Sequence, residues 1–129
     1  YNVTTNRCTV PPPIQYKDPE TVAFKYMLTK ARKNAKQCER KVLDLTLENL
    51  KEVWDKQNHI CVYSGVDLVL PIQYKSVWNN PTFTASLDRI DSSKGYVVGN
   101  IQFVSIVINR AKGNFTHEQM IEFCNIMKR

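Results

Sequence analysis

The strongest constraint on the fold is a pair of strand-like runs followed directly by a helical pattern. The runs cover residues 83–90 and 96–104, and a segment rich in turn-forming residues joins them at 91–95. Apolar residues then recur at 104, 107, 108 and 111, which is helical spacing, and Gly113 is placed to end that helix. The sequence therefore predicts a β-hairpin and then a helix, in an α+β fold.

Three further helices are predicted, and each begins at a polar residue that can cap it. The starts are Asp18, Thr46 and Thr116. Gln119, three residues after Thr116, completes a capping box. Apolar residues that recur at helical spacing mark the faces expected to be buried. They are Phe24, Leu28, Ala31, Ala35, Cys38, Leu47, Leu50, Val53, Trp54, Met120, Phe123, Cys124 and Met127.

The length of 129 residues favours one compact domain. Three consecutive prolines at 11–13 predict that residues 1–17 form an extended arm. Residues 18–129 are expected to form a single domain, with a basic helical part at 18–57 and the hairpin-containing core at about 58–129. No apolar run is long enough to cross a bilayer, so no membrane partner is expected.

Four cysteines are far apart in the sequence and include no Cys-x-x-Cys pair: Cys8, Cys38, Cys61 and Cys124. This spacing disfavours both a secreted disulfide framework and a four-cysteine zinc site. We expect free thiols in a reducing compartment, and hence an intracellular protein.

The formal net charge of +6 points to a polyanionic partner, most often nucleic acid. Residues 18–41 carry seven basic and three acidic side chains, which is a net +4 of that charge. We expect this helix to face backbone phosphates, and a solvated charged face is the alternative. The candidate DNA contacts, including one lysine of the hairpin and one of the helix after it, are Lys25, Arg32, Lys36, Arg40, Lys94 and Lys112.

The hairpin and the helix after it carry the residues suited to chemistry. Asp88 ends one predicted strand and Asn109 lies on the following helix, so a carboxylate and an amide offer oxygen ligands for a hard cation such as Mg²⁺. Arg89 and Tyr96 belong to the same hairpin. A metal ion can polarise a phosphoryl oxygen while arginine neutralises transition-state charge, which is what cleavage of a phosphodiester needs. Taken singly, these side chains also fit turn, strand and helix positions without any catalytic role.

The order of these motifs resembles the HNH nucleases. The segments that carry the resemblance are Cys61-x-x-Ser64-Gly65, Asp88-Arg89, Gly95-Tyr96, Gly99-Asn100 and Asn109-x-x-Lys112. The resemblance covers roughly residues 58–126, and residues 20–57 resemble the helices that precede this core in phage-type members. It implies a ββα-metal core and a DNA endonuclease that uses Mg²⁺ or Mn²⁺, as homing or restriction endonucleases do, in the cytoplasm of a bacterial or phage-infected host.

The same resemblance assigns roles to individual residues. It implies that Asp88 and Asn109 are the metal ligands, and that Asn100 fixes the hairpin loop through backbone hydrogen bonds. Lys112 would contact a phosphate or the end of its helix. Three zinc-ligand positions of the family are lost, and only Cys61 remains, so no structural Zn²⁺ is expected. The positions without their ligand are Ser64, Ser105 and Ile108, and we expect apolar contacts among Val62, Val104 and Ile108 in place of the metal.

Arg89 stands where the family usually has its general-base histidine. Arginine stays protonated, so it cannot take a proton from water. A subgroup that includes a rare-cutting restriction enzyme shares the Asp-Arg pair, with a tyrosine eight residues after the Asp, as Tyr96 follows Asp88 here. The resemblance to this subgroup implies that Tyr96 is the nucleophile and that Arg89 favours its phenolate and holds the phosphate. The alternative is metal-activated water, with Arg89 as a phosphate clamp only.

The leading hypothesis is therefore a metal-dependent DNA endonuclease, and the rivals are a catalytically silent DNA-binding module of the same fold and an RNA-binding accessory domain. A homodimer or an additional specificity domain is compatible with either DNA-binding role. His59 is expected in a loop and His117 on the surface, neither with an assigned role. Tyr74 and Trp78 are candidates for stacking on bases or for packing.

Overall fold

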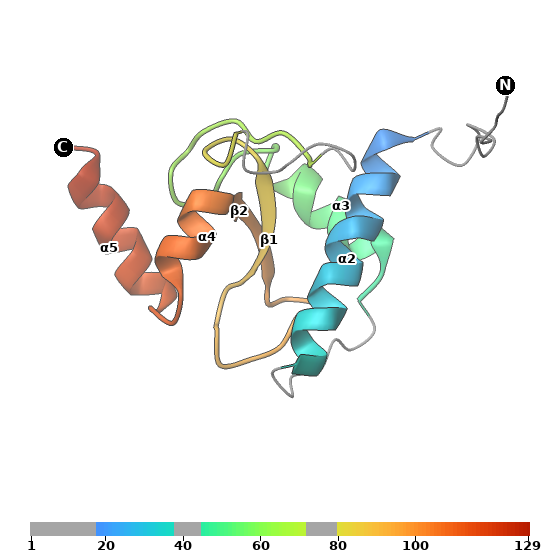
Figure 1. Cartoon of the computed structure of the whole chain (residues 1–129). Helices are drawn as coiled ribbons and strands as arrows, with labels where there is room; N and C mark the ends of the chain where they lie inside the picture. Colours follow the sequence, from blue (N-terminus) through green and yellow to red (C-terminus); the bar gives the residue numbers. More distant parts are fainter. Residues whose placement is uncertain (1–17, 38–44, 72–79) are drawn as a thin grey trace, which may run out of the picture.

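A two-stranded antiparallel sheet and the helix that follows it form the centre of the computed structural model, which describes residues 18–37, 45–71 and 80–129 (Figure 1). Strand β1 (Ala85–Arg89) pairs with β2 (Ile101–Ser105), and α4 (Ile106–Lys112) begins at the next residue. The order strand, strand, helix is as the sequence predicts. Gly113 ends α4 with a positive φ of 46°.

At their loop ends both strands are shorter than predicted, because the loop between them is held by a side chain rather than by strand pairing. The loop amides and carbonyls near its base bond to Asn100 instead of to a facing strand. Asp88 therefore lies opposite Gln102, one position before β1 ends at Arg89. This register places the residues after Arg89 in a turn.

Helices α2 (Pro19–Gln37) and α3 (Leu47–Lys56) pack against this sheet, and Figure 1 shows α2 running alongside it. Aromatic rings join the three elements: the Phe24 ring lies 6.5 Å from Trp54 and 6.0 Å from Phe103, and Trp54 lies 5.2 Å from Phe103. Phe103 is fully buried at the middle of β2. The helical part and the hairpin therefore share one hydrophobic core.

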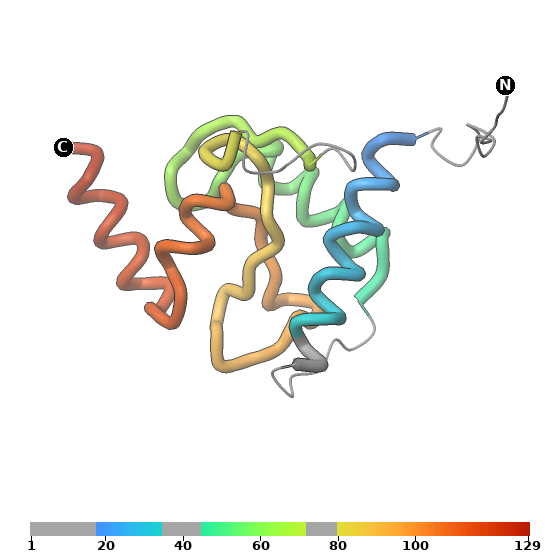
Figure 2. Tube along the Cα trace, in the orientation of Figure 1, coloured from blue at the N-terminus to red at the C-terminus, as the bar shows by residue number. Residues whose placement is uncertain are grey.

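Most helix positions predicted to be buried are buried. Phe24, Leu28, Ala31, Leu50, Trp54, Met120 and Cys124 belong to the core, and Leu47 and Val53 pack against it. The prediction was wrong for Phe123 and Met127, which are exposed. Both lie on α5 (His117–Met127), which stands at the edge of the molecule in Figures 1 and 2 and turns only Met120 and Cys124 into the core.

The predicted helix starts are confirmed at Thr46 and Thr116. Each hydroxyl accepts a hydrogen bond from the third helical amide. The side-chain oxygen of that third residue, Asn49 or Gln119, accepts a hydrogen bond from the backbone amide of the cap. No helix in the described part of the chain is long and apolar enough to cross a membrane.

Several sequence-based predictions lie outside the described residues. These are the arm at 1–17, Cys8, Cys38, Arg40, Tyr74 and Trp78, together with the side chains of Ala35 and Lys36.

Candidate functional site

Asp88 is a buried carboxylate with specific partners. The residue is buried and only 6% exposed. The oxygen Oδ2 accepts hydrogen bonds from Lys112 Nζ at 2.7 Å and from Gln102 Nε2 at 2.9 Å. Within the described residues no hydrogen bond reaches the other oxygen, Oδ1. Asp88 therefore has one oxygen fixed by the protein and one left for another ligand.

Lys112 corrects the expectation that this side chain contacts a DNA phosphate. It is fully buried, and its ammonium donates to Asp88 and to the carbonyls of Arg89 and Ile90. The last turn of α4 lies over the end of β1, so the lysine reaches the strand and not the solvent. Because a buried charge needs a partner, the role of Lys112 here is to neutralise and orient Asp88.

Further buried polar groups extend from Asp88 toward α5. Gln102 Nε2 donates to the Tyr63 hydroxyl at 2.9 Å, and that hydroxyl lies 2.7 Å from His117 Nδ1. Burial raises the pKa of Tyr63 to about 12, although the hydrogen bond from Gln102 opposes the shift. We call the connected residues Asp88, Lys112, Gln102, Tyr63 and His117 the buried polar line.

The position of His117 differs from the exposed one predicted. The imidazole is half-buried because it follows the cap of α5 and meets Tyr63. Tyr63 and Gln102 were not predicted as polar partners of Asp88. Only strand register could have indicated Gln102, since it lies opposite Asp88 in the pairing of β1 with β2.

Asn100 makes the backbone hydrogen bonds predicted for it. Its Oδ1 accepts from the Asp91 amide at 2.9 Å, and its Nδ2 donates to the carbonyls of Asp91 at 3.2 Å and Gly95 at 2.9 Å. The side chain is buried at the base of the hairpin loop. It therefore fixes the chain that leaves β1 immediately after Asp88 and Arg89.

Arg89 and Tyr96 lie together across the same loop. The Arg89 guanidinium carbon is 5.4 Å from the centre of the Tyr96 ring, a cation–π contact. The guanidinium also donates to the carbonyls of Ser92 at 2.8 Å and Lys94 at 3.2 Å. The loop therefore holds a positive charge against the face of the tyrosine.

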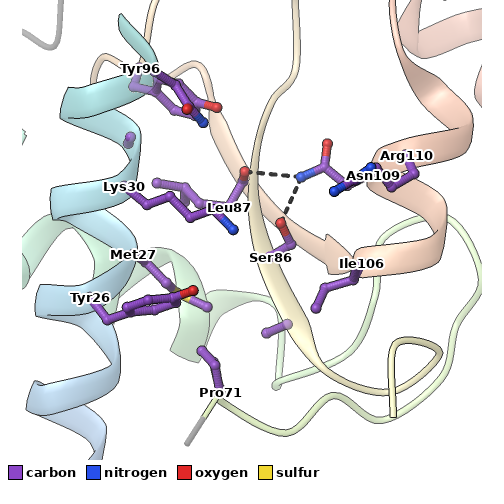
Figure 3. Close-up of a pocket in the computed structure, with 13 residues that line it drawn as sticks. Tyr26, Met27, Lys30, Pro71, Ser86, Leu87, Tyr96, Ile106, Asn109 and Arg110 are labelled. Carbon is purple, nitrogen blue, oxygen red and sulfur yellow. Dashed lines mark hydrogen bonds between the residues drawn. The ribbon is translucent and has the colours of Figure 1, made fainter. Parts of the chain in front are cut away.

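Asn109 reaches from α4 to β1. Its Nδ2 donates to Ser86 Oγ at 2.6 Å and more weakly to the Leu87 carbonyl at 3.4 Å, as Figure 3 shows. Since a backbone carbonyl can only accept, the amide nitrogen must face the strand and the amide oxygen must point away from it. Oδ1 is then directed outward, free of hydrogen bonds from the described residues.

An open pocket of about 340 Å³ lies between α2 on one side and β1 with α4 on the other (Figure 3). Tyr96 and Asn109 line it, whereas Asp88, Arg89 and Asn100 do not. Lys30 of α2 and Arg110 of α4 are the charged side chains among its described lining residues, and no Asp or Glu is among them. The pocket thus brings together two of the predicted catalytic residues with a net positive lining.

The basic side chains of α2 are divided between two sides of the helix. Lys30 lines the open pocket, although it was not among the predicted DNA contacts. At 100° per residue, Lys25 and Arg32 lie roughly 140–160° around the helix from Lys30 and are exposed there. Lys94 is also exposed, in the hairpin loop, with its ammonium 4.0 Å from Asp91. Helical spacing could indicate that Lys30 lies on a different face of α2 from Lys25 and Arg32. It could not indicate which of the two faces lies beside the hairpin.

The positions where the family has its zinc ligands are filled only partly by apolar contacts. Cys61 is buried as a free thiol, and Val104 and Ile108 pack in or against the core. The expected contribution of Val62 was wrong, since it is 42% exposed in the turn that follows Cys61. Ser105 caps α4 by accepting from the Ile108 amide at 3.2 Å. The described ranges contain no group of three or more His, Cys, Asp or Glu side chains arranged to hold a metal.

His59 lies in the turn after α3, as predicted. Its ring stacks on Trp54 at 4.4 Å between centroids, and Nε2 lies 3.4 Å from Asp55. Its φ of 62° is in the left-handed region. These contacts give His59 a structural explanation at the end of α3.

Comparison with known proteins supports the fold. No protein-family profile matches this chain, and no curated protein matches its sequence. Among solved structures, that of the rare-cutting HNH restriction endonuclease PacI is similar, with a TM-score of 0.60 and 18% sequence identity. The match covers 81% of this chain and 75% of that one. The chain therefore has an α+β fold shared with the structure of an HNH restriction endonuclease.

Proposed function

We propose that this chain is a metal-dependent DNA endonuclease with an HNH-type ββα-metal core. The observation that carries the proposal is the placement of Tyr96, against Arg89, beside Asn109 in a positively lined pocket of the hairpin–helix unit. The same unit holds Asp88 at the end of β1. Its likeness to the PacI structure supports this choice over other phosphate-binding roles.

Asp88 and Asn109 are the residues that would hold Mg²⁺ or Mn²⁺. The donor chemistry fits, because each side chain leaves one oxygen without a hydrogen bond from the described residues and hard cations take oxygen ligands. Mg²⁺ often uses only one or two protein ligands beside water and substrate phosphate. When bound, the ion would polarise a phosphoryl oxygen of the substrate.

The chain's own residues supply the nucleophile and the positive charge in this proposal. The Tyr96 hydroxyl oxygen forms a bond to phosphorus while the bond from phosphorus to the leaving sugar oxygen breaks. The phenolic proton passes to solvent, and the leaving sugar oxygen takes up a proton from solvent to become a hydroxyl. Water then cleaves the tyrosyl–phosphate bond and restores the tyrosine. Arg89 stabilises the negative charge that develops on the tyrosyl oxygen and on phosphorus during attack. Attack by metal-activated water, with Arg89 as a clamp, is the competing route.

Plasmid cleavage tests the proposal directly. The parent should cut in Mg²⁺ or Mn²⁺ and stop on addition of EDTA. Asp88→Ala alone is a poor variant, because it leaves the buried Lys112 ammonium unpaired. We therefore compare the double variant Asp88→Asn/Lys112→Met with the control variant Asp91→Asn, which changes an exposed carboxylate of the same hairpin. A folded double variant that cuts as fast as the parent would reject Asp88 as a ligand.

A catalytically silent DNA-binding module is the second candidate. The observation that favours it is the ion pair of Asp88 with Lys112, which explains a buried carboxylate without any metal. This candidate predicts DNA binding that EDTA does not alter and no strand scission during long incubation. Cleavage that requires a divalent ion would exclude it.

A further inference from the structure

We propose that α2 forms one wall of the substrate cleft and that Lys30 contacts a backbone phosphate of DNA bound in the open pocket. The inference deepens the proposed function and rests on it for the identity of the ligand. It differs from the sequence interpretation, which assigned phosphate contacts to other lysines and arginines of the same helix and not to Lys30.

The open pocket has basic side chains on two of its sides. Its described lining includes two cations, Lys30 and Arg110, that approach from different elements, and no Asp or Glu is among the described lining residues. A cleft lined by charge of one sign concentrates ligands of the other sign. The volume of about 340 Å³ lies at the lower end of the range for ligand sites, roughly 300–1,000 Å³. An anionic group such as a phosphodiester suits this lining.

The Lys30 side chain has no ion-pair partner in the described part of the chain. No Asp or Glu of the described residues pairs with Lys30, whereas Lys51 of α3 pairs with Glu20 at 2.9 Å and Lys112 pairs with Asp88. The Lys30 ammonium lies 5.8 Å from the centre of the Tyr26 ring, one turn earlier on α2. This contact is a weak one at an exposed position. The ammonium therefore stays available to an anion.

Lys30 lies across the pocket from the hairpin–helix unit. Figure 3 shows Lys30 extending from α2 toward β1, on the side of the pocket opposite Asn109 and Arg110. Tyr96 lines the same pocket. A phosphodiester that meets the Tyr96 hydroxyl would then have α4 on one side and Lys30 on the other.

Salt-dependent DNA binding in EDTA tests the proposal without cleavage. Removing one lysine–phosphate interaction lowers the slope of log Kd against log salt by about 0.9 for duplex DNA. We compare the parent with Lys30→Met, with Lys25→Met as the rival contact on the same helix, and with Lys128→Met as a control at the far end of α5. All three variants remove one positive charge from an exposed lysine, so net charge is matched.

Lys30→Met should lower the slope by about 1, Lys25→Met by less, and Lys128→Met should match the parent. The proposal is overturned if Lys30→Met matches the Lys128→Met control, or if Lys25→Met has the larger effect. Absence of salt-dependent DNA binding by the parent also overturns it. Thermal unfolding of each variant verifies that the fold is retained.

The outcome is separable from that of the proposed function. If the parent does not cut DNA in Mg²⁺ or Mn²⁺ but Lys30→Met lowers the slope of log Kd against log salt as expected, the nuclease proposal fails and the assignment of the cleft to DNA is retained. If the parent cuts and Lys30→Met has the slope and cleavage rate of the Lys128→Met control, the nuclease proposal remains and the cleft assignment fails.

Discussion

The buried polar line and the open pocket differ in whether their polar groups have partners within the protein. In the buried polar line, Lys112 and Gln102 both donate to the same oxygen of Asp88. In the open pocket, Lys30 has no carboxylate partner among the described residues, and the ring of Tyr96 has the Arg89 guanidinium over its face. The difference suggests that the first group holds the hairpin and α4 together and that the second is arranged for an external anion.

The largest effect should come from breaking the ion pair of the buried polar line. Lys112→Met keeps much of the side-chain volume but leaves Asp88 charged, buried and unpaired, which typically costs about 3–5 kcal/mol. We expect a decrease of that size in the free energy of unfolding, measured with urea. Asp88→Asn/Lys112→Met should recover most of it, because neither charge remains. Equal stability of the single variant and the parent would show that the ion pair is not structural.

Tyr96→Phe tests the open pocket. If Tyr96 is the nucleophile, its removal should slow cleavage at least about 100-fold, equivalent to about 2.7 kcal/mol in the barrier. The free energy of unfolding should change little, because the hydroxyl accepts and donates no hydrogen bond among the described residues. The parent, but not the variant, should form a protein–DNA adduct that survives denaturation. An unchanged cleavage rate without a trapped adduct would favour attack by water.

Asn100→Ala tests the link between the two regions. The substitution removes hydrogen bonds to the Asp91 amide and to the carbonyls of Asp91 and Gly95. The free energy of unfolding should fall by about 2 kcal/mol, since buried backbone groups are left unpaired. Asn114→Ala, at an exposed site after α4, is the matched control. Similar unfolding midpoints for both variants would contradict the structural role of Asn100.

Tyr63→Phe should have the smallest effect near neutral pH, about 1 kcal/mol, since it removes one partner from Gln102 and His117. The pH dependence of the free energy of unfolding is a more specific test of Tyr63. The pKa of Tyr63 is raised to about 12, above the unfolded value of 10, because burial disfavours the phenolate. Its contribution is therefore complete below pH 10 and is lost as pH rises from 10 to 12. The stability difference between parent and Tyr63→Phe should shrink across that window.

Local features of the chain were predictable because they depend on neighbours in the sequence. The caps at Thr46 and Thr116 need a hydroxyl and an amide three residues later, and Gly113 ends α4 where a positive φ is required. The order of the hairpin and α4 follows from periodicity and turn residues. The backbone hydrogen bonds of Asn100 were predicted only through the resemblance to the HNH nucleases, because the residues alone also fit an ordinary turn.

The placement of the lysines could not be predicted, because it depends on contacts between elements far apart in the sequence. Helical periodicity gives the angle of Lys30 relative to Lys25 but does not say which side of α2 faces β1. Lys112 resembles a surface lysine until α4 packs over the end of β1 and encloses it beside Asp88. The sequence by itself determined the order of the hairpin and helices and the types of side chain that each of them carries. Only the packing of α2 and α4 against β1 decided which side chains are enclosed and which face the pocket.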